Sequence, residues 1–148
     1  EKEVNMLQTY PTKSYRLFSG WLLLAAVLAA VFSWRGISVG GIRSGRFLVL
    51  LLFLLLDLLY LMIYLNQKVY WAGAVTYEEA KAAGPAARKR YALFHLLIFS
   101  AAALLQLAYC FSTLSFMSNG VVQDSIVSGT VFCAAAAAAG KIRCEKKH

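Results

Sequence analysis

Four long runs of apolar residues, separated by short polar stretches, make up most of the chain. A helix needs about 20 residues to cross roughly 30 Å of hydrocarbon, where lipid offers the backbone no hydrogen bonds. Within the runs, polar residues neither recur every third or fourth position, as in a soluble bundle, nor alternate with apolar ones, as in a membrane barrel. The pattern predicts an all-α integral membrane protein with one antiparallel bundle over residues 1–148. Its four transmembrane helices are expected at about 17–34, 47–66, 91–112 and 118–139.

The second run is the most apolar of the four, and the fourth is the least. Residues 47–65, FLVLLLFLLLDLLYLMIYL, hold a single acid, Asp57, near their midpoint. The first half of the fourth run is polar, so a re-entrant or surface-lying helix is the alternative to a crossing there. Its length and the basic stretch KIRCEKKH that follows favour a crossing.

Lysine and arginine are unequally divided between the two sides that four crossings define. The N-terminal segment, the loop 67–90 and the C-terminal tail share one side and hold twelve of the fifteen. The other side, with the glycine-rich turn expected at 36–46, holds Arg35, Arg43 and Arg46. Because cytoplasmic loops carry the excess of Lys and Arg, both termini are expected on the cytosolic side, or on the matrix or stromal side of an organelle.

Composition agrees with a membrane protein and changes how the net charge of +8 is interpreted. The chain is 60% apolar and only 15% charged, against roughly 25% charged in soluble proteins. The cations flank the apolar runs, which is typical of loops that face anionic headgroups and not of a nucleic-acid surface. Arg88, Lys89 and Arg90 are the predicted lipid headgroup contacts.

The cysteines show no metal or redox spacing. Cys110, Cys133 and Cys144 form no CxxC pair and have no clustered histidines, so the sequence predicts no metal site, no cofactor and no catalytic set. Cys144 lies beside the membrane within KIRCEKKH, which makes it a candidate lipidation site.

Inside the bilayer, Asp57 must either take a proton or face a hydrogen-bonding partner. A central aspartate costs about 2.5 to 3.5 kcal/mol on insertion scales, whereas each Leu, Ile, Phe or Val contributes roughly 0.3 to 0.6 in favour, so the helix still inserts. Tyr60 and Tyr64 follow Asp57 on the same helical face. This face is therefore predicted to contact protein, either within the chain or on a partner.

The third helix offers groups that match this face. His95, Gln106 and Tyr109 fall on one side of it, and the depth of Gln106 fits Asp57 best. His95 lies nearer the membrane surface, where we expect it to donate to a backbone carbonyl or to reach headgroups. A proton relay between histidine and carboxylate is the alternative.

The fourth helix carries Asp124 and Ser128 on one predicted contact face. A second face has small residues at a four-residue spacing, which lets helix backbones approach closely; these are Ser125, Gly129, Cys133 and Ala137. A helix N-terminus favours an acid such as Asp124. Its depth disagrees with that of Asp57, so a paired-carboxylate site is not expected.

These features favour a non-enzymatic accessory or structural subunit, packed against other integral membrane subunits in a larger complex. Loops this short leave no room for a soluble catalytic module. The alternative is a small oligomeric transporter, channel or proton-conducting subunit that uses Asp57. In outline only, four crossings with both ends cytosolic, the topology resembles tetraspan proteins of the MARVEL type, which implies a membrane-organising role as a further alternative.

Overall fold

The computed structural model describes residues 10–35, 44–112 and 120–144, and within them the chain is all-helical, with 83% helix and no strand. The prediction of an all-α protein is confirmed. The described residues contain four long helices and two short ones: α1 (Arg16–Arg35), α2 (Ser44–Asn66), the 3₁₀ helix η2 (Val69–Ala72), α3 (Tyr77–Ala82), α4 (Pro85–Phe111) and α5 (Gly120–Ala139).

Three of the long helices meet the length and composition of a membrane crossing. They are Gly45–Asn66, Pro85–Phe111 and Gly120–Ala139. The apolar helical stretch of α1 is shorter, Arg16–Phe32. The chain therefore has the character of a multi-pass membrane protein.

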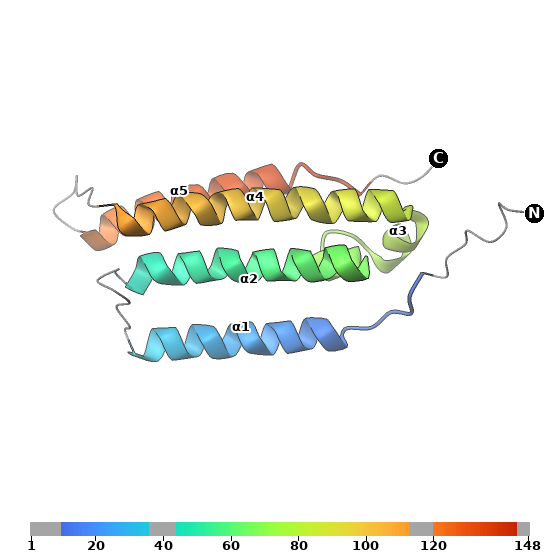
Figure 1. The fold of residues 1–148 in the computed structure, drawn as a ribbon, viewed down its shortest axis with the longest axis horizontal. Helices are drawn as coiled ribbons and strands as arrows, with labels where there is room; N and C mark the ends of the chain where they lie inside the picture. The colour runs from blue at the N-terminus through green and yellow to red at the C-terminus, as the bar shows by residue number, and fades with distance from the viewer. Residues whose placement is uncertain (1–9, 36–43, 113–119, 145–148) are drawn as a thin grey trace, which may run out of the picture.

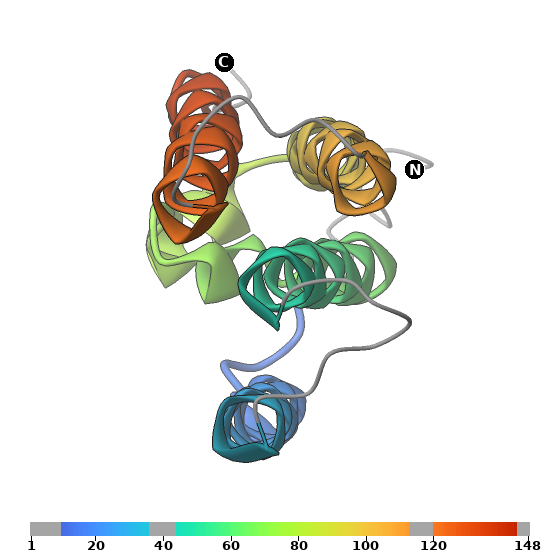
Figure 2. The ribbon, with the colours of Figure 1, turned by 90° about the vertical axis from the view of Figure 1, so that its left-hand side faces the viewer.

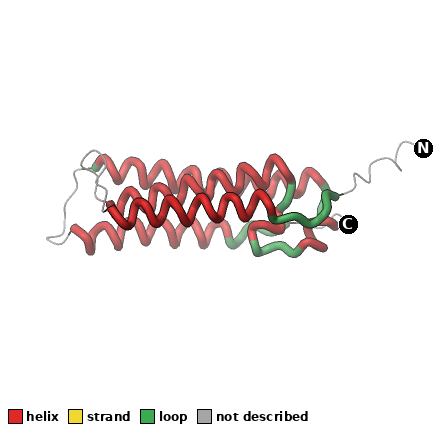
Figure 3. Tube along the Cα trace, turned by 90° about the horizontal axis from the view of Figure 1, so that it is seen from below, coloured by secondary structure: helices red, strands yellow, loops and turns green. Residues whose placement is uncertain are grey.

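The long helices lie side by side, with α2 at the centre (Figures 1 and 2). Seen end-on, α2, α4 and α5 form a triangle, and α1 packs on the opposite side of α2 (Figure 2). The short helices and their loops gather at one end of the bundle (Figure 3). This end carries Arg88, and the other carries Arg46; the two are called the Arg88 end and the Arg46 end below.

The core forms where bulky side chains of α2 meet small ones of α4. Phe53 and Ile63 of α2 are fully buried. On α4, Ala92, Ala102 and Ala103 are buried and leave room for them. Since lipid is as apolar as leucine, close van der Waals packing of this kind is what holds helices together in a membrane.

Helix α1 contacts α2 through one narrow stripe. Phe18, Trp21, Ala25, Leu28 and Phe32 are half-buried and follow a three-and-four spacing. The Trp21 indole Nε1 donates to the backbone carbonyl of Leu55 at 2.9 Å. The leucines and valines around this stripe are exposed, as expected of a surface that faces lipid.

The connection between α2 and α4 contains a capping box at the start of α3 (Tyr77–Ala82). The Thr76 hydroxyl accepts from the Glu79 backbone N–H at 3.2 Å, and the Glu79 carboxylate accepts from the Thr76 backbone N–H at 2.9 Å. Helix α3 ends at Ala82, and Pro85 begins α4. Pro suits this first position because its missing N–H has no helical partner there.

Two helices begin earlier than the apolar pattern predicts. Helix α4 starts at Pro85 instead of near 91, so the basic run Arg88–Arg90 lies in its first turns and not in a loop. Helix α2 starts at Ser44 instead of 47, which places Arg46 in the helix and not in the expected turn 36–46. A search for apolar runs misses polar residues at helix ends, because the ends of a membrane helix can extend beyond the hydrocarbon. The rest of that turn lies outside the described residues.

Candidate functional site

Five polar side chains from three helices meet at the Arg46 end, where α4 ends and α5 begins. They are Arg46 of α2, Gln106 and Tyr109 of α4, and Asp124 and Ser128 of α5. We call this set the polar cluster. The sequence placed four of its members, Gln106, Tyr109, Asp124 and Ser128, on predicted contact faces, and the structure brings these four together.

An ion pair forms the centre of the polar cluster. The Arg46 Nε donates to Asp124 Oδ1 at 2.7 Å, with the two side chains only 11% and 10% exposed. The Tyr109 hydroxyl donates to the same oxygen at 2.8 Å. The Arg46 guanidinium also lies 4.2 Å from the centre of the Tyr109 ring. Asp124 is therefore held by a cation and a hydroxyl from two different helices.

Helix ends add to this arrangement. The Arg46 Nη1 donates to the carbonyls of Tyr109 and Ser112, at 3.2 and 3.3 Å, in the last turn and C-cap of α4. The last carbonyls of a helix lack intrahelical donors and carry its partial negative charge, so a cation is favoured there. Asp124, the fifth residue of α5, lies near the opposite, positive kind of helix end.

Gln106 links the same three helices just below the ion pair. Its side chain is fully buried, and its Nε2 donates to the Ser128 hydroxyl at 3.0 Å and to the Arg46 carbonyl at 3.1 Å. Its Oε1 is buried without a hydrogen-bond partner among the described residues. The polar cluster thus fixes the rotation and depth of α2, α4 and α5 relative to one another.

The structure corrects the predicted match between Asp57 and Gln106. Gln106 bonds within the polar cluster, three turns away from Asp57 along α2. The neighbour of the Asp57 carboxyl is instead the Ser100 hydroxyl of α4. Asp57 is half-buried, and its Oδ1 is buried without a partner in the described part of the chain. The acid faces α4, but the depth estimate selected the wrong residue on that helix.

Tyr60 and His95 meet in an aromatic stack between α2 and α4. The Tyr60 ring lies 4.7 Å from the His95 ring and 5.5 Å from the Phe99 ring, nearly parallel to both. The His95 Nδ1 donates to the Tyr91 carbonyl at 2.9 Å. This is the expected backbone role. Tyr64, the third residue of the predicted face, is half-buried, with the Lys89 Nζ 5.9 Å from its ring centre.

The proton-relay alternative lacks the required contact. Among the described residues, no hydrogen bond or ion pair joins His95 to a carboxylate, and no group of three His, Cys, Asp or Glu could hold a metal ion. The polar cluster itself consists of groups that bond to each other. These bonds hold α2, α4 and α5 in position relative to one another.

Arg88 lies inside protein and not toward headgroups as predicted. It is 5% exposed, and its Nη1 donates to the carbonyls of Ala80 and Ala83 at 3.0 and 2.8 Å. Its guanidinium also bonds the Gln67 side chain and lies 4.5 Å from the Tyr10 ring centre. Arg88 therefore holds the connection between α2 and α4 together. Lys89 and Arg90 are exposed, and the headgroup role stays a prediction for them.

The three cysteines are free and lie in different environments. Cys110 is buried, Cys133 is exposed and Cys144 is partly buried against the core. Burial raises the pKa of the Cys144 thiol, the nearby Arg88 charge lowers it, and Glu79 raises it. Lipidation of Cys144 stays a prediction, and the tail that carries it packs back onto the bundle.

Arg46 is the member of the polar cluster that was missed from the sequence, because it was counted as a loop cation. The sequence did contain a sign of this pairing. The predicted topology places Arg46 and Asp124 near the same end of the bundle, and opposite charges at one level within the bilayer are expected to pair.

Comparison of the chain with protein-family models, curated proteins and solved structures finds no match.

Proposed function

We propose that this chain is a non-enzymatic, four-helix antiparallel membrane protein that serves as an accessory or structural subunit of a larger membrane protein complex. The observation that carries the proposal is how its intramembrane polar groups are used. Arg46, Asp124, Gln106 and Ser128 bond to each other and to helix ends. Such a set stabilises packing, because its donors and acceptors are used in bonds between helices.

The outer face of α5 supports a protein partner. Ser125, Cys133 and Ala137 are exposed, and Gly129 has open space within 4 Å of where a side chain would begin. Exposed small residues at this spacing allow another helix to approach closely, whereas a purely lipid-facing helix has no use for them. The other integral membrane subunits would dock here.

The proposed orientation has both termini on the cytosolic, matrix or stromal side. The charge of Arg46 on the opposite side is neutralised, since Arg46 is paired with Asp124. Twelve Lys and Arg then stand against Arg35 and Arg43. Labelling of single cysteines placed near residue 10 and at 144 with a membrane-impermeant reagent tests this: both should react only from that side.

Native copurification tests the subunit role. A tagged chain extracted in mild detergent should carry other membrane subunits at fixed stoichiometry, and Ala137→Leu or Gly129→Leu should release them. Ala101→Leu is the matched control, since Ala101 is exposed on α4, away from this face. A monodisperse monomer from the native membrane would contradict the proposal, as would equal release by the control.

A small oligomeric transporter or proton-conducting subunit is the second candidate. Its supporting observation is the buried Oδ1 of Asp57, which lacks a partner among the described residues. Reconstituted protein would then pass protons or solute in an Asp57→Asn-sensitive manner, while Asp124→Asn serves as the control acid. Silent vesicles containing folded protein would exclude this candidate.

A further inference from the structure

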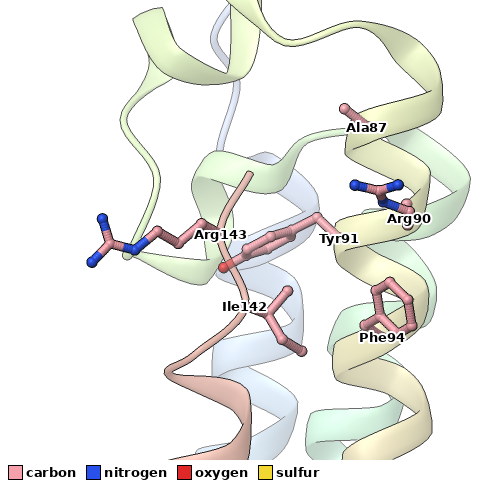
Figure 4. Close-up of a pocket in the computed structure, with 6 residues that line it drawn as sticks. All are labelled: Ala87, Arg90, Tyr91, Phe94, Ile142 and Arg143. Carbon is pink, nitrogen blue, oxygen red and sulfur yellow. The ribbon is translucent and has the colours of Figure 1, made fainter. Parts of the chain in front are cut away.

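A pocket of about 280 Å³ lies between the first turns of α4 and the segment that follows α5 (Figure 4). Its lining divides into polar and apolar parts. Arg90, Arg143 and Tyr91 supply two guanidinium groups and a hydroxyl, and Phe94 and Ile142 supply apolar surface; Ala87 completes it. Figure 4 shows Arg90 and Phe94, four residues apart, on the same side of α4. The Arg143 guanidinium points away from Arg90.

Tyr91 adds a hydroxyl group to the polar part of the pocket. The residue is only 3% exposed, and no described residue hydrogen-bonds to its hydroxyl. In Figure 4 its ring reaches across the pocket toward residues 142 and 143. The hydroxyl is not among the enclosed polar atoms that lack a partner, so it is accessible from the pocket. A ligand oxygen can accept a hydrogen bond from it.

The position of the pocket along α4 specifies the kind of ligand. Arg90 stands where the helix passes from its basic first turns into its apolar length. Below it, Phe94 is 47% exposed and Leu97, one turn further, is 55% exposed. Cations above and lipid-facing apolar side chains below mark the level of the headgroups in a membrane. Guanidinium groups match phosphate oxygens in geometry and charge.

We propose that this pocket binds one anionic phospholipid. Its phosphate accepts from the Tyr91 hydroxyl and from Arg90, and Arg143 adds positive charge at the rim. An acyl chain then runs along Phe94 and Leu97. The pocket needs to hold only the headgroup, because the acyl chain lies outside it against the exposed helix face. The inference rests on membrane insertion and is independent of the proposed subunit role.

Lipid retention measured by native mass spectrometry tests the proposal. The full chain is prepared in detergent micelles that contain either phosphatidylglycerol or phosphatidylcholine, and the detergent is then removed in the mass spectrometer. One phosphatidylglycerol molecule should be retained, and phosphatidylcholine far less. Tyr91→Phe should weaken retention by about tenfold, the value of one hydrogen bond to a charged group, and Arg90→Gln by at least as much. Tyr91→Phe keeps the ring that packs 4.3 Å from His95, so folding is preserved.

Lys89→Gln is the matched control, because it removes the same charge from the neighbouring position without lining the pocket. It should leave retention within about twofold of the wild-type value. Equal losses in Lys89→Gln and Arg90→Gln, with none in Tyr91→Phe, would overturn the proposal in favour of general attraction between charges. Displacement of the lipid by millimolar inorganic phosphate would overturn it in favour of a free-anion site.

Discussion

The Arg46 guanidinium and the Asp124 carboxylate lie 2.7 Å apart, although 78 positions separate them in the chain. The pair joins the first turn of α2 to the start of α5, and α4 contributes two carbonyls and a hydroxyl to it. A charge pair so enclosed is weak evidence for net stability, since desolvation offsets attraction. Its value lies in the penalty for separating the partners, which opposes any other arrangement of the helices.

Breaking this pair from one side should be costly. Arg46→Met or Asp124→Leu leaves one uncompensated charge and should lower the free energy of unfolding by about 3 to 5 kcal/mol. The double variant should be less destabilised than either single variant, because no unpaired charge remains. Reversible unfolding in mixed micelles, followed by circular dichroism, measures this. If the double variant lost as much free energy of unfolding as the two single variants together, the two residues would not act as a coupled pair.

Gln106→Leu should destabilise the bundle by about 1 to 3 kcal/mol, because it leaves the Ser128 hydroxyl and the Arg46 carbonyl without their donor. Ser128→Ala should cost about 0.5 to 1.5 kcal/mol. Ser125→Ala is the control: that exposed hydroxyl bonds only within its own helix, to Val121, and its loss should change stability by less than about 0.5 kcal/mol. The same unfolding assay ranks the three variants. Equal effects of Ser125→Ala and Ser128→Ala would show that the bond between Gln106 and Ser128 does not stabilise the packing of α4 against α5.

Trp21→Phe should loosen α1 from α2. The variant keeps most of the ring but removes the indole donor to Leu55, a loss of about 1 kcal/mol. Phe32 and Phe47, whose rings are 5.0 Å apart, report on the same interface when both are replaced by cysteine. Disulfide formation between those cysteines should slow in the Trp21→Phe background. Leu23→Phe, on the exposed side of α1, should leave the rate unchanged.

The Cys144 thiol should react with iodoacetamide along a pH profile displaced to higher pH than that of a free cysteine. Burial and Glu79 raise its pKa, so less thiolate is present at a given pH. The folded state holds this proton more tightly, so stability is full below the ordinary thiol pKa of 9.0 and falls as pH rises above it. The measurement uses a background of Cys110→Ala and Cys133→Ser, so that Cys144 is the thiol that reacts.

Glu79→Gln should move that profile back toward lower pH. Glutamine still completes the capping box with Thr76, so the charge is removed while the cap remains. Glu78→Gln removes an equal charge from the neighbouring position and should shift the profile less. A Cys144 profile at or below that of free cysteine, or equal shifts in the two glutamine variants, would contradict the electrostatic assignment.

The helices themselves follow from the sequence alone. Long apolar runs in lipid can satisfy their backbone only as helices, so α2, α4 and α5 were predictable from length and composition. The capping box at Thr76 was equally predictable, since its groups are three residues apart. Helical periodicity also predicted that Tyr60 lies on a face of α2 that contacts protein. Each of these features depends on contacts that are close in the chain.

Only the tertiary structure decided which polar groups pair. Periodicity placed Asp57, Gln106 and Asp124 on faces, but it left the rotation and axial depth of each helix undetermined, and one turn of error changes every partner. Hence Gln106 bonds Ser128 and not Asp57, Arg88 is buried and not at headgroups, and Arg46 pairs with Asp124. Those choices come from close packing of α2 against α4 and α5, a property of the assembled bundle that no single segment contains.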